Sequence, residues 1–175
     1  MMKISDTMYD VVLVHYGEIA LKGKNRPFFE KKLVESIENK LTEKVTRERG
    51  FIKIILKPSS SMKLIEEKLS KTFGIAWFAF AYSCEKDIDK INKIACKHAD
   101  FKKTMKVDSK RSDKTFPMTS MDINKKVGEA LFNKGAKISM KPDKKIFVEL
   151  ADNAYVFFEK QKGLVVCQLA SAAKS

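Results

Sequence analysis

The 175-residue sequence lacks the features that mark membrane, secreted and metal-stabilised proteins. No apolar run reaches the length of a membrane span, and Lys3 and Asp6 precede only a short Val-rich run, which is not a signal peptide. The three cysteines, Cys84, Cys96 and Cys167, form no C-x-x-C pair, which argues against a disulfide framework and a structural zinc. We therefore expect a cytoplasmic protein with buried, inert thiols and with no metal or cofactor.

The sequence also lacks the groups of residues on which most enzymes depend. It has no nucleophile elbow and no set of paired carboxylates, and neither His15 nor His98 has a partner at metal-ligand spacing. His15 lies in an apolar run, where a structural role is the usual one. The segment 17–25, GEIALKGKN, resembles a P-loop, but five residues separate its glycines instead of four, and Asn25 replaces the Ser or Thr that would hold magnesium. We do not expect ATP to bind there.

Positive charge is what the sequence has in excess. It contains 35 Lys and Arg against 22 Asp and Glu, a net charge of +13, which points to a polyanionic partner, either nucleic acid or an anionic membrane. A membrane partner would require a basic amphipathic helix with Trp or Phe on its apolar face. The strongest positive cluster lies instead in a loop, which favours nucleic acid over a membrane.

The order of elements in residues 1–82 predicts a ferredoxin-like βαββαβ domain, with two helices on one face of an antiparallel sheet. Apolar Phe29, Leu33 and Ile37 recur at helical spacing, and Phe28 is expected to widen their stripe. Ile52 and Ile54 mark the inner face of a strand from which Lys53 is expected to point outward. The predicted elements are a strand at 9–16, a helix from Pro27 to Leu41, strands at 46–48 and 51–57, a helix capped by Ser60 or Ser61 and ended by Gly74, and a strand at 75–82.

Residues 83–175 predict a second domain of α/β type. Asp87 is expected to cap its first helix, and Gly135 to stop its second. Alternation of apolar residues predicts strands near 105–108, 146–150 and 155–158, and the last residues of the chain are expected to add a final strand. No Gly/Ser-rich linker separates the halves, so we expect them to pack against each other as one rigid body.

Residues 109–120 form the most informative loop. A polar turn carrying Lys110, Arg111 and Lys114 leads to Phe116, and Thr119 or Ser120 is placed to cap the following helix. Helix amides and nearby cations together suit a phosphate group. Phe116, beside a proline in a polar loop, is a better candidate for stacking on a nucleic-acid base than Trp77 or Phe80, which lie in an apolar strand. The alternative interpretation, a solvated connecting loop, stays open.

A second cluster of cations, Lys22, Lys24 and Arg26, lies at the start of the first helix. These side chains suit contacts with an RNA backbone, and a solvated loop again stays open as the alternative. Asn25 and Arg26 beside Gly23 would also fit a small phosphatase, but only by analogy of fold.

Four segments carry a resemblance to a known family: HYGEIALKGKNRPFFEKKL at 15–33, FGI at 73–75, MKVDSKRSDKTFPMTSMDI at 105–123 and KPDKKIFVEL at 141–150. In these segments the chain resembles the N-terminal half of the tRNA 4-thiouridine synthetase, or tRNA sulfurtransferase, family. The resemblance implies a ferredoxin-like domain at 1–82 packed against a THUMP domain at 83–175. It also implies that the two domains grip the acceptor stem and the single-stranded 3′ end of tRNA, while a separate ATP-pyrophosphatase domain adenylates a uridine that then receives sulfur.

The chain departs from that family after Gly163, where the glycine-rich linker G-G-L-P-x-G and the pyrophosphate loop S-G-G-x-D-S are missing. No catalytic residue of the family is therefore carried over. The binding residues that the resemblance implies are Lys22, Lys24, Asn25, Arg26, Lys110, Arg111, Lys114, Phe116, Thr119 and Ser120.

These observations predict a tRNA-binding module that presents tRNA to a separate or missing ATP-pyrophosphatase. The alternative is a protein–protein adaptor in a tRNA thiolation or methylation complex, with the basic face docked on an acidic enzyme. An autonomous enzyme is the weakest interpretation, because no group of residues supports one. The sequence predicts no oligomeric state.

Overall fold

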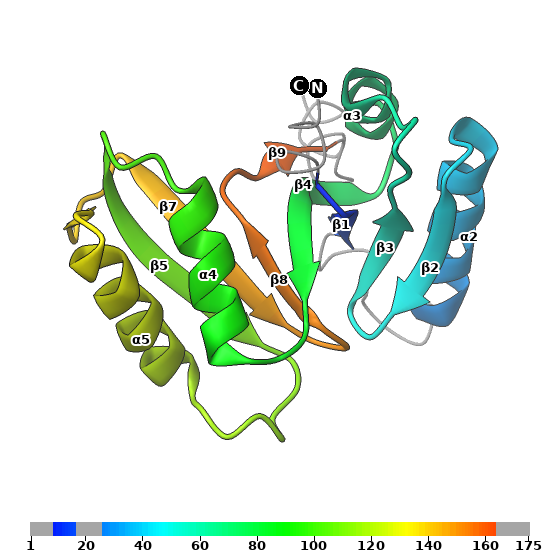
Figure 1. The fold of residues 1–175 in the computed structure, drawn as a ribbon. Coiled ribbons are helices and arrows are strands. Elements are labelled where there is room, and N and C mark those ends of the chain that lie inside the picture. Colours follow the sequence, from blue (N-terminus) through cyan, green and yellow to red (C-terminus); the bar gives the residue numbers. More distant parts are fainter. Residues whose placement is uncertain (1–8, 17–25, 164–175) are drawn as a thin grey trace, which may run out of the picture. The chain divides into compact units, whose positions relative to one another are not determined.

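A computed structural model describes residues 9–16 and 26–163 of the chain (Figure 1). The described residues fall into two compact units. The N-terminal unit comprises Asp10–Phe80 together with the residues after Glu159, and the C-terminal unit comprises Ala81–Glu159. Strand β4 (Ile75–Cys84) contributes residues to both units.

The N-terminal unit has the predicted ferredoxin-like order. Its elements are β1 (Val11–Tyr16), α2 (Arg26–Lys40), β2 (Lys44–Glu48), β3 (Phe51–Ile55), α3 (Met62–Ser70) and the first part of β4. The strands lie in the order β2-β3-β1-β4, and β3 pairs antiparallel with both of its neighbours. The short strand β9 (Gln161–Lys162) pairs with β4 at Trp77 and Phe78, a pairing that the sequence did not predict.

Three details of this unit differ from expectation. Phe28 is 63% exposed, because it lies one residue around the helix from Phe29, and only Phe29 shares the stripe of Leu33 and Ile37. Lys53 does not point into solvent: it is 9% exposed, because β3 lies between two other strands, and its Nζ is 3.7 Å from Glu48 Oε2. Helix α3 ends at Ser70, before Gly74.

The C-terminal unit combines a mixed sheet with two helices. Its elements are the end of β4, α4 (Ile88–His98), β5 (Thr104–Arg111), α5 (Ser120–Asn133), β6 (Lys137–Ile138), β7 (Lys144–Leu150) and β8 (Ala154–Phe157). The strand order is β4-β8-β7-β5-β6, in which β5 runs parallel to β7 and β6. Asp87 caps α4 as predicted, whereas the two-residue strand β6 was not predicted.

Helices α4 and α5 lie side by side on one face of this sheet (Figure 1). Met105 and Val107 of β5 and Ile146 and Val148 of β7 are buried beneath them, together with Ile123 and Val127 of α5. Since successive side chains of a strand point to opposite faces, the alternate residues of β5 and β7 point away from the helices.

Gly74 allows a change of direction that a larger residue would oppose. Its φ is +91°, and a Cβ built there would lie 2.8 Å from Phe29 Cζ. We expect Gly74→Ala to lower the free energy of unfolding by about 1–2 kcal/mol, because an L-residue is strained at positive φ. Gly128 is the matched control: it is within α5 and has open space around it, so Gly128→Ala should stabilise the chain by about 0.5–1 kcal/mol. Urea unfolding measures both, and equal midpoints for wild type and Gly74→Ala would contradict the expectation.

Candidate nucleic-acid interface

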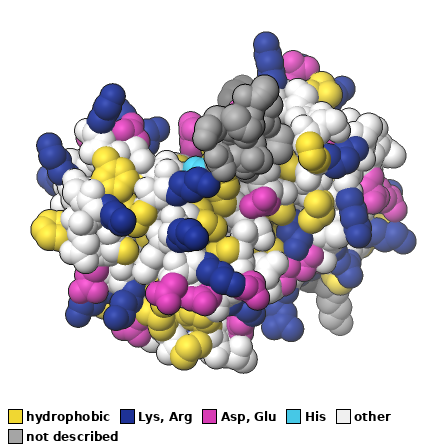
Figure 2. All heavy atoms as spheres, in the orientation of Figure 1, with side chains coloured by type: hydrophobic (Ala, Val, Ile, Leu, Met, Phe, Trp, Pro, Cys, Tyr) yellow, Lys and Arg dark blue, Asp and Glu magenta, His cyan; other side chains and the backbone are white. Residues whose placement is uncertain are grey.

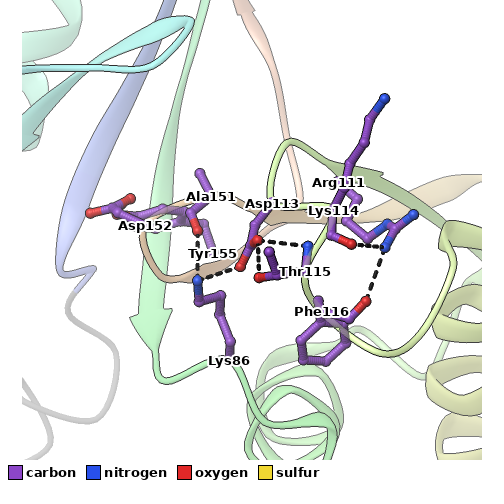
Figure 3. A network of polar contacts seen from close by, with 9 residues as sticks. All are labelled: Lys86, Arg111, Asp113, Lys114, Thr115, Phe116, Ala151, Asp152 and Tyr155. Carbon is purple, nitrogen blue, oxygen red and sulfur yellow. Dashed lines mark hydrogen bonds and ion pairs between the residues drawn. The ribbon is translucent and has the colours of Figure 1, made fainter.

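The loop at residues 112–119, which connects β5 to α5, is held in place by an ion pair between Lys86 and Asp113 (Figure 3). Lys86 Nζ lies 2.5 Å from Asp113 Oδ2 and donates a second hydrogen bond to the carbonyl of Ala151 at 3.1 Å. The Thr115 amide donates to Asp113 Oδ1 at 2.9 Å, and the Thr115 hydroxyl donates to the same oxygen. The Lys86 ammonium, just before α4, thus links the loop, through Asp113, to the turn between β7 and β8, through Ala151.

These bonds favour the ionised form of Asp113. The hydrogen bond from Lys86, followed by those from the Thr115 hydroxyl and amide, holds the pKa of Asp113 well below its usual range. The carboxylate is therefore charged at neutral pH, and the charge of Lys86 is used to hold the loop.

Arg111 also shapes the loop. Its Nη1 donates to the carbonyl of Phe116 at 3.0 Å and to that of Lys114 at 3.4 Å (Figure 3). Lys110 and Arg111 are the last two residues of β5, so the prediction that they lie in the turn is wrong. The strand extends this far because β5 keeps its parallel register with β7 as far as Leu150. Arg111 therefore retains only part of its donor fork for a ligand.

Lys110, near the end of β5, and Lys114, in the loop, are the cations of this region that remain available. Both are exposed, and within residues 9–16 and 26–163 neither ammonium forms an ion pair. An ammonium with no carboxylate partner can contact a phosphate without first breaking an internal bond.

Phe116 is less open than expected. It is half-buried and packs against the core of the C-terminal unit, as Met118 does. The ring is thus supported from behind by apolar side chains, and only its outer part is available for stacking.

The start of α5 has the cap that the sequence predicted, at Thr119. The Thr119 hydroxyl accepts from the Asp122 amide at 3.1 Å, and the Thr119 amide donates to Asp122 Oδ2, also at 3.1 Å. The hydrogen bond from the Thr119 amide, followed by one from the Thr119 side chain, lowers the pKa of the Asp122 carboxyl. Ser120 contributes its carbonyl, which accepts from the Ser109 hydroxyl at 2.8 Å. Because a carboxylate already lies at the helix start, the dipole of α5 attracts a phosphate less than the sequence suggested.

Of the first predicted cluster, Lys22, Lys24 and Asn25 lie outside the described residues, and Arg26 opens α2. Arg26 Nε donates to Glu30 Oε2 at 3.3 Å, and the Tyr16 hydroxyl donates to the same oxygen. Arg47 Nη1 of β2 is 3.8 Å from Glu30 Oε1. Glu30 is 8% exposed, so a buried carboxylate holds two half-exposed guanidinium groups near each other.

Sequence reasoning missed this arrangement. The four-residue spacing of Arg26 and Glu30 was a readable signal, because side chains at that spacing meet on a helix. Nothing in the sequence indicated that Arg47 would lie near Glu30, because the pairing of β2 with β3 places it there. Burial, and then the hydrogen bond to Glu30, raises the pKa of Tyr16 to about 12, so its hydroxyl stays protonated at neutral pH.

Lys and Arg side chains are spread over the visible face of each unit, among acidic and apolar ones (Figure 2). The described residues contain no group of His, Cys, Asp and Glu that could hold a metal ion. None of the described helices is long and apolar enough to cross a membrane. The expectation of buried thiols is wrong for Cys84 and Cys96, which are both half-buried, although partial burial still raises the pKa of Cys96.

Two protein-family models match the chain. The ThiI ferredoxin-like domain matches residues 11–79, and the THUMP domain matches residues 84–159. A probable tRNA sulfurtransferase of Thermoanaerobacter sp. (strain X514) is 33% identical over 175 residues, which cover 96% of this chain and 46% of that protein. The chain thus spans about half the length of the curated relatives it matches.

Two solved structures superpose on most of this chain. PH1313 from Pyrococcus horikoshii superposes with a TM-score of 0.76 at 27% identity, over 89% of this chain and 56% of that one. A 4-thiouridine synthetase, crystallised as an RNA complex with bound ATP, superposes with a TM-score of 0.75 at 26% identity, over 90% of this chain and 42% of that one.

The Lys86–Asp113 pair gives the chain a predictable response to acid. Because the pKa of Asp113 is lower in the folded than in the unfolded chain, its ionised form stabilises the fold. This contribution is complete above the ordinary aspartate pKa near 4 and is lost as the pH falls through the lowered value. Asp113→Asn should therefore unfold at a lower temperature than wild type at pH 7, and the difference should shrink below about pH 4.

Thermal unfolding from pH 7 to pH 2.5 provides the measurement, with Glu129→Gln, at an exposed position of α5, as a control for loss of one carboxylate. A difference between Asp113→Asn and wild type that is the same at both ends of the range would show that the ion pair does not stabilise the loop.

Proposed function

Because this chain joins a ThiI ferredoxin-like domain to a THUMP domain and so belongs to the tRNA sulfurtransferase family, we propose that it binds tRNA and presents it for 4-thiouridine formation. The two domains grip the acceptor stem and the unpaired 3′ end. The chemistry belongs to an ATP-pyrophosphatase domain, either in the rest of a longer protein or in a separate partner.

One observation carries this proposal. Both units together resemble a synthetase that was crystallised with RNA, with a TM-score of 0.75 over 90% of this chain. The net charge of +13 supports a nucleic-acid partner, since phosphate contacts supply most of the sequence-independent affinity for RNA.

Different described residues bind different parts of the RNA. Lys110, near the end of β5, and Lys114, in the loop shaped by Arg111 and the Lys86–Asp113 pair, supply phosphate contacts. Phe116 supplies the edge of a ring for an unpaired base. In the N-terminal unit, Glu30 orients Arg26 and Arg47 so that their outer N–H groups face solvent, a fork that suits a phosphate. Lys22, Lys24 and Asn25 complete this first cluster in the proposal.

The direct test is an electrophoretic mobility shift with purified chain and unmodified tRNA, without any partner protein. The proposal predicts a complex that forms with tRNA alone and that is competed away by an acceptor-stem minihelix. A chain that binds no tRNA alone, but binds a pyrophosphatase enzyme, would be the protein adaptor instead.

Lys110 and Lys114 should dominate the salt dependence of binding. We expect Lys110→Ala and Lys114→Ala each to lower affinity and to flatten the plot of log affinity against log salt by about one unit, as each removes one phosphate contact. Lys93→Ala is the control, because Lys93 is an exposed lysine of α4 outside the loop. Fluorescence anisotropy with a labelled tRNA between 50 and 300 mM salt measures the slopes. The same slope for all three variants would mean that positive charge acts without a defined site.

Phe116→Ala should act differently from the lysine variants. Loss of a stacking ring costs about 1–3 kcal/mol of binding with little change in salt slope, and only when the RNA has an unpaired 3′ end. Since Phe116 also packs against the core, Met118→Ala is the matched control: it removes a neighbouring half-buried side chain that is not aromatic. Minihelices with and without the 3′ overhang are compared by anisotropy. The stacking role is excluded if Phe116→Ala keeps the preference for the overhang, or if Met118→Ala loses it equally.

A further inference from the structure

The sheet of the C-terminal unit has a second face, which α4 and α5 do not cover. Met105, Val107, Ile146 and Val148 point to the helices and are buried. By the alternation of strand side chains, the residues between them point to the other face. On β5 these are Lys106, Asp108 and Lys110, and on β7 they are Lys145, Phe147 and Glu149.

The register of the two parallel strands places two lysines opposite each other on this face. Lys106 pairs with Lys145, one strand spacing apart, or about 4.8 Å. Like charges directly opposite on a sheet are destabilising. Within the part of the chain that the structure describes, neither ammonium forms an ion pair with a carboxylate. Lys106 is half-buried and Lys145 is exposed, so both can reach solvent.

The acidic residues of this face do not neutralise the pair. Asp108 is two residues along β5 from Lys106 and is exposed. Glu149 is opposite Lys110 and is only 3% exposed. The fold therefore keeps a repulsive pair at a position where one neutral residue would relieve the repulsion.

We propose that Lys106 and Lys145 together bind a phosphate of the RNA backbone, which extends the RNA-binding surface from the 112–119 loop along the helix-free face of β5. This proposal rests on the proposed function. A backbone phosphate between the two ammonium groups brings one negative charge within reach of both and so offsets their repulsion when RNA binds. Lys110 is four residues further along the same face, roughly 13 Å at the rise of a strand. A strand of RNA can therefore run from the loop over Lys110 to the Lys106–Lys145 pair.

The test replaces each lysine by glutamine, which keeps most of the side-chain length and removes the charge. Lys106→Gln and Lys145→Gln are compared with Lys144→Gln, a matched control on the same strand. Lys144 is adjacent in sequence and exposed, but strand alternation points it to the opposite face. The probe is an acceptor-stem minihelix with its 3′ overhang, whose affinity is measured across the salt range.

Each site variant should bind the minihelix several-fold more weakly and flatten the salt slope by no more than about one unit, because the two lysines share one phosphate, whereas Lys144→Gln should match wild type. Asp108→Asn should bind more tightly than wild type, because it removes a negative charge beside the path of the backbone.

Thermal unfolding without RNA gives a second measurement, in which the stability of the site variants should rise while their affinity for RNA falls. Lys106→Gln and Lys145→Gln should unfold at a temperature on the order of 1–3 °C higher than wild type, because each relieves the repulsion, and Lys144→Gln should not. A variant that is more stable yet binds RNA more weakly cannot owe its lost affinity to poor folding.

Binding by Lys106→Gln and Lys145→Gln equal to that of Lys144→Gln would overturn the inference and leave the proposed function standing. A wild-type chain that binds no tRNA would overturn the proposed function itself. A competition with inorganic phosphate at constant ionic strength tests whether the two lysines bind a free anion instead of the RNA backbone. If it displaces the minihelix from wild type but not from Lys106→Gln, at low millimolar concentration, the pair is a free-anion site and not part of an RNA surface.

Discussion

The ion pair between Lys86 and Asp113 is the interaction on which the candidate interface depends. It joins residues far apart in sequence, and through the Ala151 carbonyl it reaches the turn between β7 and β8 as well. The cost of ordering a polar loop is large, and a loop without such a link would sample many conformations. With the link in place, Arg111 can bond the carbonyls of Lys114 and Phe116, and Thr119 can cap α5 at a defined position. A loop held in this way presents its lysines from a preorganised frame, which lowers the entropy lost when a ligand binds.

The cations of this chain serve two purposes, and the structure separates them. Lys86 is paired with Asp113, and Arg111 bonds backbone carbonyls, so these two side chains shape the loop, whereas Arg26 and Arg47 are paired with Glu30 but stay half-exposed. Lys106, Lys110, Lys114 and Lys145 have no ion-pair partner among the described residues. The unpaired lysines are the ones with charge to spare for a polyanion.

Much of the fold could be predicted because local signals agreed with it. The Thr119 cap with Asp122 three residues later, and the alternation of Ile146, Val148 and Leu150, both follow from short-range rules that the structure obeys. The predictions failed at positions where tertiary contacts determine the structure. Lys53 is buried because β3 is flanked on both sides, and Arg111 belongs to a strand because β7 continues beside it. Arg47 comes close to Arg26, and Lys106 lies beside Lys145, only because distant strands pair. No local pattern in the sequence predicts that pairing. Lys22, Lys24 and Asn25 lie outside the described residues, so their predicted role stays a prediction.

The central claim is that the ferredoxin-like and THUMP domains by themselves hold tRNA by the acceptor stem and the unpaired 3′ end. Hydroxyl-radical footprinting of a full-length tRNA by the purified chain tests it directly, because cleavage of each ribose reports protection nucleotide by nucleotide. The result expected is protection confined to the acceptor stem and the 3′ end, at a protein concentration that saturates binding. Protection spread evenly over the whole tRNA, or confined to the anticodon arm, would contradict the claim.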